Sequence, residues 1–106
     1  MVYVVETSEY APGKREEALA FLKKAAAYYK KMAGVEYDMV QRVAAAAGQQ
    51  AKLTAISVFD SLTAWDDFAQ KRKKDPEWLT LTRGIFAPEQ GCWTHNSYTR
   101  TFLEVL

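Results

Sequence analysis

The sequence predicts an α+β fold in which the elements follow the order β-α-β-β-α-β and four strands form one antiparallel sheet. Two observations support this prediction. Four runs are rich in β-branched and aromatic residues or alternate between apolar and polar side chains, as strands do. Two longer stretches between them repeat apolar residues every three or four positions, which is typical of amphipathic helices. Because the chain has only 106 residues, we expect a single domain over residues 1–106.

The first strand is predicted over Val2–Tyr10, where valine and tyrosine suit a pleated backbone. The first helix is predicted over Lys14–Ala33. Its apolar side chains recur at helical spacing, and lysines cover the opposite side. Gly34 follows at the position where a left-handed residue commonly ends a helix, so the end of this helix is well defined.

The next two strands are predicted over Val35–Val43 and Leu53–Asp60, with a hairpin loop over Ala44–Lys52. A second helical region is predicted over Leu62–Ile85, and the hydroxyl groups of Ser61 and Thr63 offer two candidate caps for its start. Within this region Asp75-Pro76 combines a capping acid with a proline suited to a first helical turn. We therefore expect the region to consist of two helices.

The last strand is predicted over Trp93–Leu106. The helices must bury their apolar sides against the sheet, and right-handed crossovers then place both on one side, as in ferredoxin-like folds. The first, third and last strands carry apolar residues on both faces, so the other face also needs a cover. A second copy of the chain is the simplest cover, and we expect a homodimer whose sheets pack face to face.

The composition excludes several classes of function. The net charge of +1 gives no reason to expect nucleic acid or an anionic membrane as a partner. The basic run Lys71–Lys74 is expected to be a solvated face, and acids nearby nearly cancel its charge. A lone cysteine, Cys92, allows neither an internal disulfide nor a cysteine-based metal cluster. No signal peptide and no transmembrane run is visible, so we expect a cytoplasmic protein.

Two segments carry a family resemblance over essentially the whole chain. Tyr10–Leu19 leads into the first helix, and Val58–Trp65 leads into the second, with Asp75–Trp78 after it. In these segments the chain resembles the dimeric α/β-barrel superfamily, and most of all its NIPSNAP-like and antibiotic-biosynthesis-monooxygenase-like members. The superfamily includes cofactor-free monooxygenases, haem-degrading and chlorite-type haem enzymes, polyketide cyclases and lactone isomerases. The resemblance therefore implies a dimeric α/β barrel more specifically than it implies an activity.

Candidate catalytic residues gather at the start of the last strand. His95 is the only histidine, and it could act as a general base or ligate haem, or it could simply be a polar residue at a strand start. Trp93 is predicted to share its face. Asn96, Tyr98 and Arg100 are predicted on the other face, where they could orient a carbonyl or phenolate oxygen or pair across strands. One histidine cannot complete a zinc or iron triad, so no metal site is predicted.

Large aromatic side chains are the candidates for binding a planar ligand, although such residues also dominate ordinary cores. The candidate substrate-binding residues are Tyr37, Trp65, Phe68, Trp78 and Trp93. In monooxygenase-like members Asn, Trp and His groups often contribute to the active pocket, which the resemblance implies for Asn96, Trp65 and His95. The haem-degrading pattern places its histidine on the second helix, where this chain has none.

The expected function is a small-molecule enzyme that acts on a planar hydrophobic substrate, aromatic or polyketide-like, without a bound cofactor. In a monooxygenase or cyclase reaction, His95 or a nearby tyrosine would remove a proton, and Asn96 or a backbone donor would stabilise the oxyanion. Two alternatives stay open. One is a non-catalytic small-molecule-binding protein of the same fold, and the other is a haem-binding enzyme that uses His95.

Overall fold

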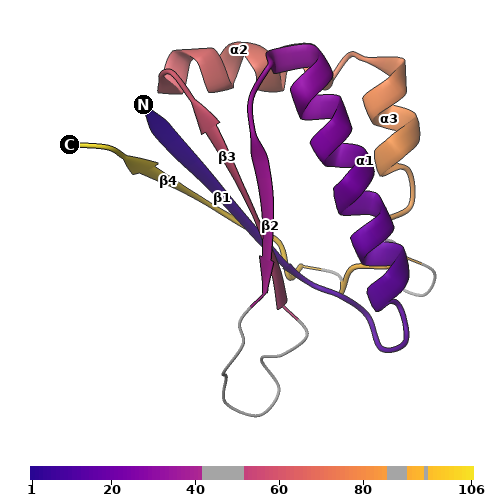
Figure 1. Cartoon of the computed structure of the whole chain (residues 1–106). Coiled ribbons are helices and arrows are strands. Elements are labelled where there is room, and N and C mark those ends of the chain that lie inside the picture. The colour runs from indigo at the N-terminus through magenta and orange to yellow at the C-terminus, as the bar shows by residue number, and fades with distance from the viewer. Residues whose placement is uncertain (42–51, 86–90, 95) are drawn as a thin grey trace.

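A computed structural model describes residues 1–41, 52–85, 91–94 and 96–106 (Figure 1). The elements in chain order are β1 (Val2–Glu9), α1 (Arg15–Ala33), β2 (Tyr37–Gln41), β3 (Lys52–Phe59), α2 (Leu62–Arg72), α3 (Pro76–Thr82) and β4 (Thr99–Glu104). This order confirms the predicted α+β class and the division of the second helical region into two helices. Most of the predicted hairpin loop falls at residues 42–51, outside the described residues.

The four strands form one antiparallel sheet in the order β2-β3-β1-β4, and the helices cover one face of it (Figure 1). Chain-adjacent strands β2 and β3 pair directly, whereas β1 lies between β3 and β4. Such an arrangement is the ferredoxin-like fold that the sequence predicts. Because successive side chains of a strand point to opposite faces, β1 places Val2, Val4, Glu6 and Ser8 together on the face toward the helices.

Two hydrophobic clusters fill the space between the sheet and the helices. The first joins β1, α1, β3 and α2, and its buried members are Val2, Val4, Tyr28, Tyr29, Phe59, Trp65 and Phe68. The second lies toward the start of α1, and its buried members are Ala18, Leu22, Leu53, Ala55, Cys92 and Trp93. Large aromatic rings dominate the first cluster, whereas smaller side chains prevail in the second.

The helix ends follow the local signals in the sequence. Gly34 adopts φ 68° after α1, and this left-handed conformation is one that glycine reaches without steric cost. Ser61 caps α2 by accepting the backbone N–H of Ala64 at 3.0 Å, and Asp75 caps α3 by accepting that of Glu77 at 3.0 Å. The capping residues therefore fix where α2 and α3 begin.

The last strand is shorter than predicted. It begins at Thr99 instead of Trp93, because Asn96 takes a left-handed backbone with φ 63° and the Ser97 N–H closes a turn on the Thr94 carbonyl at 3.2 Å. Trp93 forms only an isolated bridge with Tyr10. The described residues just before Thr99 are therefore not strand, and the predicted alternation of faces fails there.

The helix-free face of the sheet carries an apolar patch, as the sequence predicts. Tyr3 on β1 and Leu103 on β4 are directly opposed, and they are 38% and 49% exposed. Val5, Ile56 and Val58 continue this face and are half-buried. No described helix is long and apolar enough to cross a membrane.

Candidate functional site

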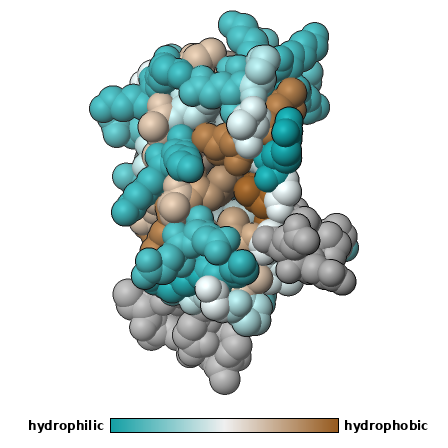
Figure 2. Space-filling view, turned by 90° about the vertical axis from the view of Figure 1, so that its right-hand side faces the viewer, coloured by the Kyte–Doolittle hydropathy of each residue, from teal (hydrophilic) through white to brown (hydrophobic). Residues whose placement is uncertain are grey.

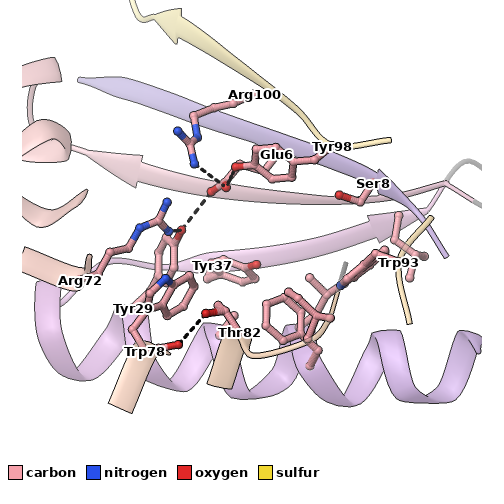
Figure 3. Close-up of a pocket in the computed structure, with 15 residues that line it drawn as sticks. Glu6, Ser8, Tyr29, Tyr37, Arg72, Trp78, Thr82, Trp93, Tyr98 and Arg100 are labelled. Atoms are coloured by element: carbon pink, nitrogen blue, oxygen red, sulfur yellow. Dashed lines mark hydrogen bonds and ion pairs between the residues drawn. The ribbon is translucent and has the colours of Figure 1, made fainter. Parts of the chain in front are cut away.

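A cavity of about 250 Å³ lies between the inner face of the sheet and the helices (Figure 3). Its apolar walls include Phe21, Leu22, Ala25, Trp78, Ile85 and Trp93. Its polar side is formed by Glu6, Tyr29, Tyr37, Arg72, Tyr98 and Arg100. Apolar walls with a few convergent polar groups are typical of small-molecule sites. An engineered cavity of about 150 Å³ holds benzene, so this one suits a molecule of roughly one or two rings.

The surface on one side of the molecule also has an apolar centre. Figure 2 shows the side on which α1 and α3 lie, where apolar residues gather in the middle within a border of hydrophilic ones. A hydrophobic molecule approaching from here would therefore meet an apolar centre.

Glu6 is the centre of the polar side. Its Oε1 accepts a hydrogen bond from the Tyr29 hydroxyl at 3.0 Å. Its Oε2 accepts one from the Tyr98 hydroxyl and lies 3.5 Å from Nη2 of Arg100. The β1–β4 register places Arg100 directly opposite Glu6, so the two strands themselves hold this ion pair together. The carboxylate is held from both sides, and its orientation in the cavity is fixed.

Arg72 extends this network from the last turn of α2. Its side chain is buried, and its Nη1 donates a hydrogen bond to the Tyr29 hydroxyl at 2.6 Å. Its guanidinium carbon lies 4.7 Å from the ring centre of Trp78 and 5.0 Å from that of Trp65, within cation–π range. Arg72, Tyr29 and Glu6 therefore form a hydrogen-bonded chain along one side of the cavity (Figure 3).

Three cavity tyrosines are held in their neutral form. Burial, followed by the negative charge of Glu6, raises the pKa of Tyr29, Tyr37 and Tyr98 well above its usual value. A phenol with a raised pKa does not supply a phenolate base at neutral pH. Tyr98 can accept a proton only if its own proton passes on, and Glu6 is the acceptor already hydrogen-bonded to it.

The structure brings together some of the residues that the sequence nominates. Tyr37, Trp78, Trp93 and Tyr98 line the cavity. Trp65 and Phe68 are instead buried members of the first hydrophobic cluster, and neither is part of the cavity lining. Asn96 is exposed in the turn before β4 and does not line the cavity, while His95 lies outside the described residues.

Sequence reasoning did not nominate Glu6, Tyr29 and Arg72 as site residues. Glu6 follows Val2 and Val4 at every second position, so its charge stands on the buried face of a predicted strand, where charges are uncommon. Arg72 lies within a basic run that was interpreted as a solvated surface. Both signals are present in the sequence.

Several solved structures have the same fold as this chain. No protein-family model matches the sequence, and a search of curated proteins also finds no match. Among solved structures, a NIPSNAP domain protein from Burkholderia xenovorans matches with a TM-score of 0.77 at 14% identity, covering 100% of this chain and 95% of that one. A Bordetella bronchiseptica protein named after the antibiotic biosynthesis monooxygenases matches with a TM-score of 0.71 at 12% identity, covering 99% and 96%.

A Deinococcus radiodurans protein, also named after the antibiotic biosynthesis monooxygenases, matches with a TM-score of 0.69 at 16% identity over 99% of this chain and 92% of that one. The chain therefore has the ferredoxin-like fold of NIPSNAP-like and antibiotic-biosynthesis-monooxygenase-like proteins, which confirms the resemblance at the level of the fold. Sequence identities this low do not show that the chain shares an activity with these proteins, because one fold supports many reactions.

Proposed function

We propose that the protein is an enzyme that binds a planar hydrophobic substrate, aromatic or polyketide-like, in this cavity and removes a proton from it. The reaction would be of the monooxygenase or cyclase type, without a bound cofactor. The observation that carries the proposal is the carboxylate of Glu6, held by Tyr98 and Arg100 at the polar side of a cavity whose other walls are apolar. An ordinary hydrophobic core would not need a hydrogen-bonded carboxylate at this place.

The proton would leave the substrate through Tyr98. An acidic O–H or C–H proton moves to the Tyr98 oxygen while the phenolic proton of Tyr98 moves to Glu6, so no phenolate has to persist. The guanidinium of Arg100 lies beside the same carboxylate and would stabilise the negative charge that forms on the substrate. The apolar walls would limit access of water to that anion.

Aromatic rings would orient the substrate. Tyr37 and Trp78 stand near Tyr29, with ring centres 4.8 Å and 5.9 Å from the ring centre of Tyr29. Rings that already pack against one another keep their orientation when a ligand enters, so little order has to be gained on binding. A flat substrate would therefore stack without large rearrangement of these walls.

Removing the hydroxyl of Tyr98 tests the proposal. Purified wild-type protein and a Tyr98→Phe variant would be incubated in air with a panel of anthrones and planar phenols, and products would be measured by mass spectrometry. We expect Tyr98→Phe to lower kcat by about 10- to 100-fold and to change KM little, because water replaces the lost proton carrier only in part. Tyr10→Phe is the matched control, since Tyr10 loses the same hydroxyl outside the cavity lining.

Two results would count against this function. Full turnover by Tyr98→Phe would remove Tyr98 from the proton path. Binding of panel members without conversion of any of them would favour the alternative, a non-catalytic small-molecule-binding protein of the same fold.

We further propose that a second copy of the chain covers the outer face of the sheet, giving a dimeric α/β barrel. Its support is the apolar face that includes Tyr3, Ile56 and Leu103.

Light scattering of the wild type at micromolar concentration should give the mass of a dimer, and light scattering of the Leu103→Lys variant should give the mass of a monomer. Leu79→Lys on α3 is the control, because Leu79 is 48% exposed and Leu103 is 49% exposed. A monomeric wild type would contradict the proposal.

A further inference from the structure

Charge in the cavity is unbalanced. Its described lining holds one carboxylate, that of Glu6, and two guanidinium groups, those of Arg72 and Arg100. Arg72 is 8% exposed, so its positive charge is almost removed from water. Burying a cation is unfavourable unless an anion compensates for it.

The partners of Arg72 do not supply that anion. In the described part of the chain its hydrogen bond goes to the neutral Tyr29 hydroxyl, and its other contacts are the faces of aromatic rings. Glu6 reaches Arg72 only through Tyr29, while the other oxygen of Glu6 serves Tyr98 and Arg100. A guanidinium has five N–H donors, and the hydrogen bond to Tyr29 uses one of those on Arg72.

We propose that the cavity selects planar aromatic carboxylates, with the carboxylate of the ligand held by Arg72 and Arg100. This inference rests on the proposed function and narrows its substrate class. A carboxylate is charged at neutral pH, whereas an ordinary phenol is not, so a carboxylate supplies the missing negative charge. The planar fork of a guanidinium also matches the two oxygens of a carboxylate. Trp78, which lies beside Arg72, lines the cavity and would contact the ring of the ligand.

The opposite end of the cavity indicates a second polar group on the ligand. Trp93 is 3% exposed and lines the cavity, and its Nε1 has no hydrogen-bond partner among the residues described. Figure 3 shows Trp93 across the cavity from Arg72. A buried indole N–H normally has an acceptor. A hydroxyl or carbonyl oxygen at the far end of the ring system would provide it.

Binding of two matched probes tests this inference without any need for turnover. Calorimetry at pH 7.5 would compare 2-naphthoate with 2-naphthamide, which has the same rings and no charge. We expect the wild type to bind the acid at least about tenfold more tightly than the amide, since hydrogen bonds between charged groups are the strong ones. Arg72→Met should abolish this preference, and Arg72→Lys should retain part of it because the charge remains.

Arg15→Met is the matched control, because Arg15 lies outside the cavity lining and bonds Gln41 at the exposed start of α1. It should keep the full preference for the acid. Equal binding of acid and amide by the wild type would overturn the inference and leave the proposed function standing, whether or not Arg72→Met folds. Unchanged preference in a folded Arg72→Met variant would also overturn it. Failure of both probes to bind would contradict the cavity as a site, and with it the proposed function.

Discussion

Replacing Glu6 with glutamine is expected to lower kcat by about 10²- to 10⁴-fold, the range that a positioned acid or base contributes. Glutamine keeps the shape of the side chain and one acceptor oxygen, so Tyr29 can still find a partner. It does not accept the proton that Tyr98 must pass on, so the transfer loses its destination. We expect a larger effect at Glu6 than at Tyr98, because Tyr98 only passes the proton on and Glu6 receives it. Water can replace a group that passes a proton on more easily than the group that finally accepts it.

Steady-state rates of product formation with any converted panel substrate would measure this effect. Glu9→Gln is the matched control, since it makes the same change on β1 outside the cavity lining, and it should keep its activity. Thermal unfolding of both variants separates loss of chemistry from loss of fold. If folded Glu6→Gln turns over as fast as Glu9→Gln, Glu6 has no part in the reaction.

The elements that the sequence predicts well are those with strong local signals. Gly34 ends α1, and Asp75-Pro76 starts α3, because capping and proline geometry depend on only a few neighbouring residues. The start of β4 was predicted wrongly because Asn96 can adopt a left-handed backbone without being glycine. The polar residues around it, Thr94 and Ser97, were the available sign of a turn.

The turn also explains why the predicted faces of this segment fail. Alternation would have separated Trp93 from Tyr98, yet both line the cavity, because the described residues between them, Thr94, Asn96 and Ser97, do not continue a strand. Periodicity describes only regular backbone, and a residue beyond a turn can return to the same side. The packing of the helices on the sheet also decides which aromatic side chains line the cavity and which fill the core. This packing joins residues that are far apart in the sequence, so local sequence patterns do not predict it.

Two signals in the sequence point to the polar network. Glu6 continues the inward series of Val2 and Val4, so a charge on that face needs a partner inside the protein. Arg72 follows Phe68 by four positions, which places both on one side of the helix, while its basic neighbours lie elsewhere. The basic run was treated as one surface, although only one of its members shares the apolar face. The connection through Tyr29 could not be predicted, because it joins three separate elements.

Replacing Trp65 with alanine is expected to destabilise the protein by about 3–5 kcal/mol, the usual effect of deleting a large buried ring. Trp65 is 2% exposed, and its ring centre lies 5.2 Å from that of Phe59. The guanidinium carbons of Arg72 and Arg100 lie 5.0 Å and 4.9 Å from the same ring. The ring therefore supports the hydrophobic cluster and also positions both cations of the cavity.

Chemical denaturation monitored by circular dichroism would measure the loss in Trp65→Ala, with Leu62→Ala as the control. Leu62 lies on the same helix and is 49% exposed, so its truncation should change the free energy of unfolding by about 0.5 kcal/mol or less. Trp65→Phe, which keeps an aromatic ring, should lie between the two. The opposite pattern, an unchanged stability of Trp65→Ala with loss of ligand binding, would make Trp65 a ligand-contacting residue. Because Trp65 lies outside the cavity lining but against both arginines, we expect its loss to act on binding only through the packing that holds Arg72 and Arg100.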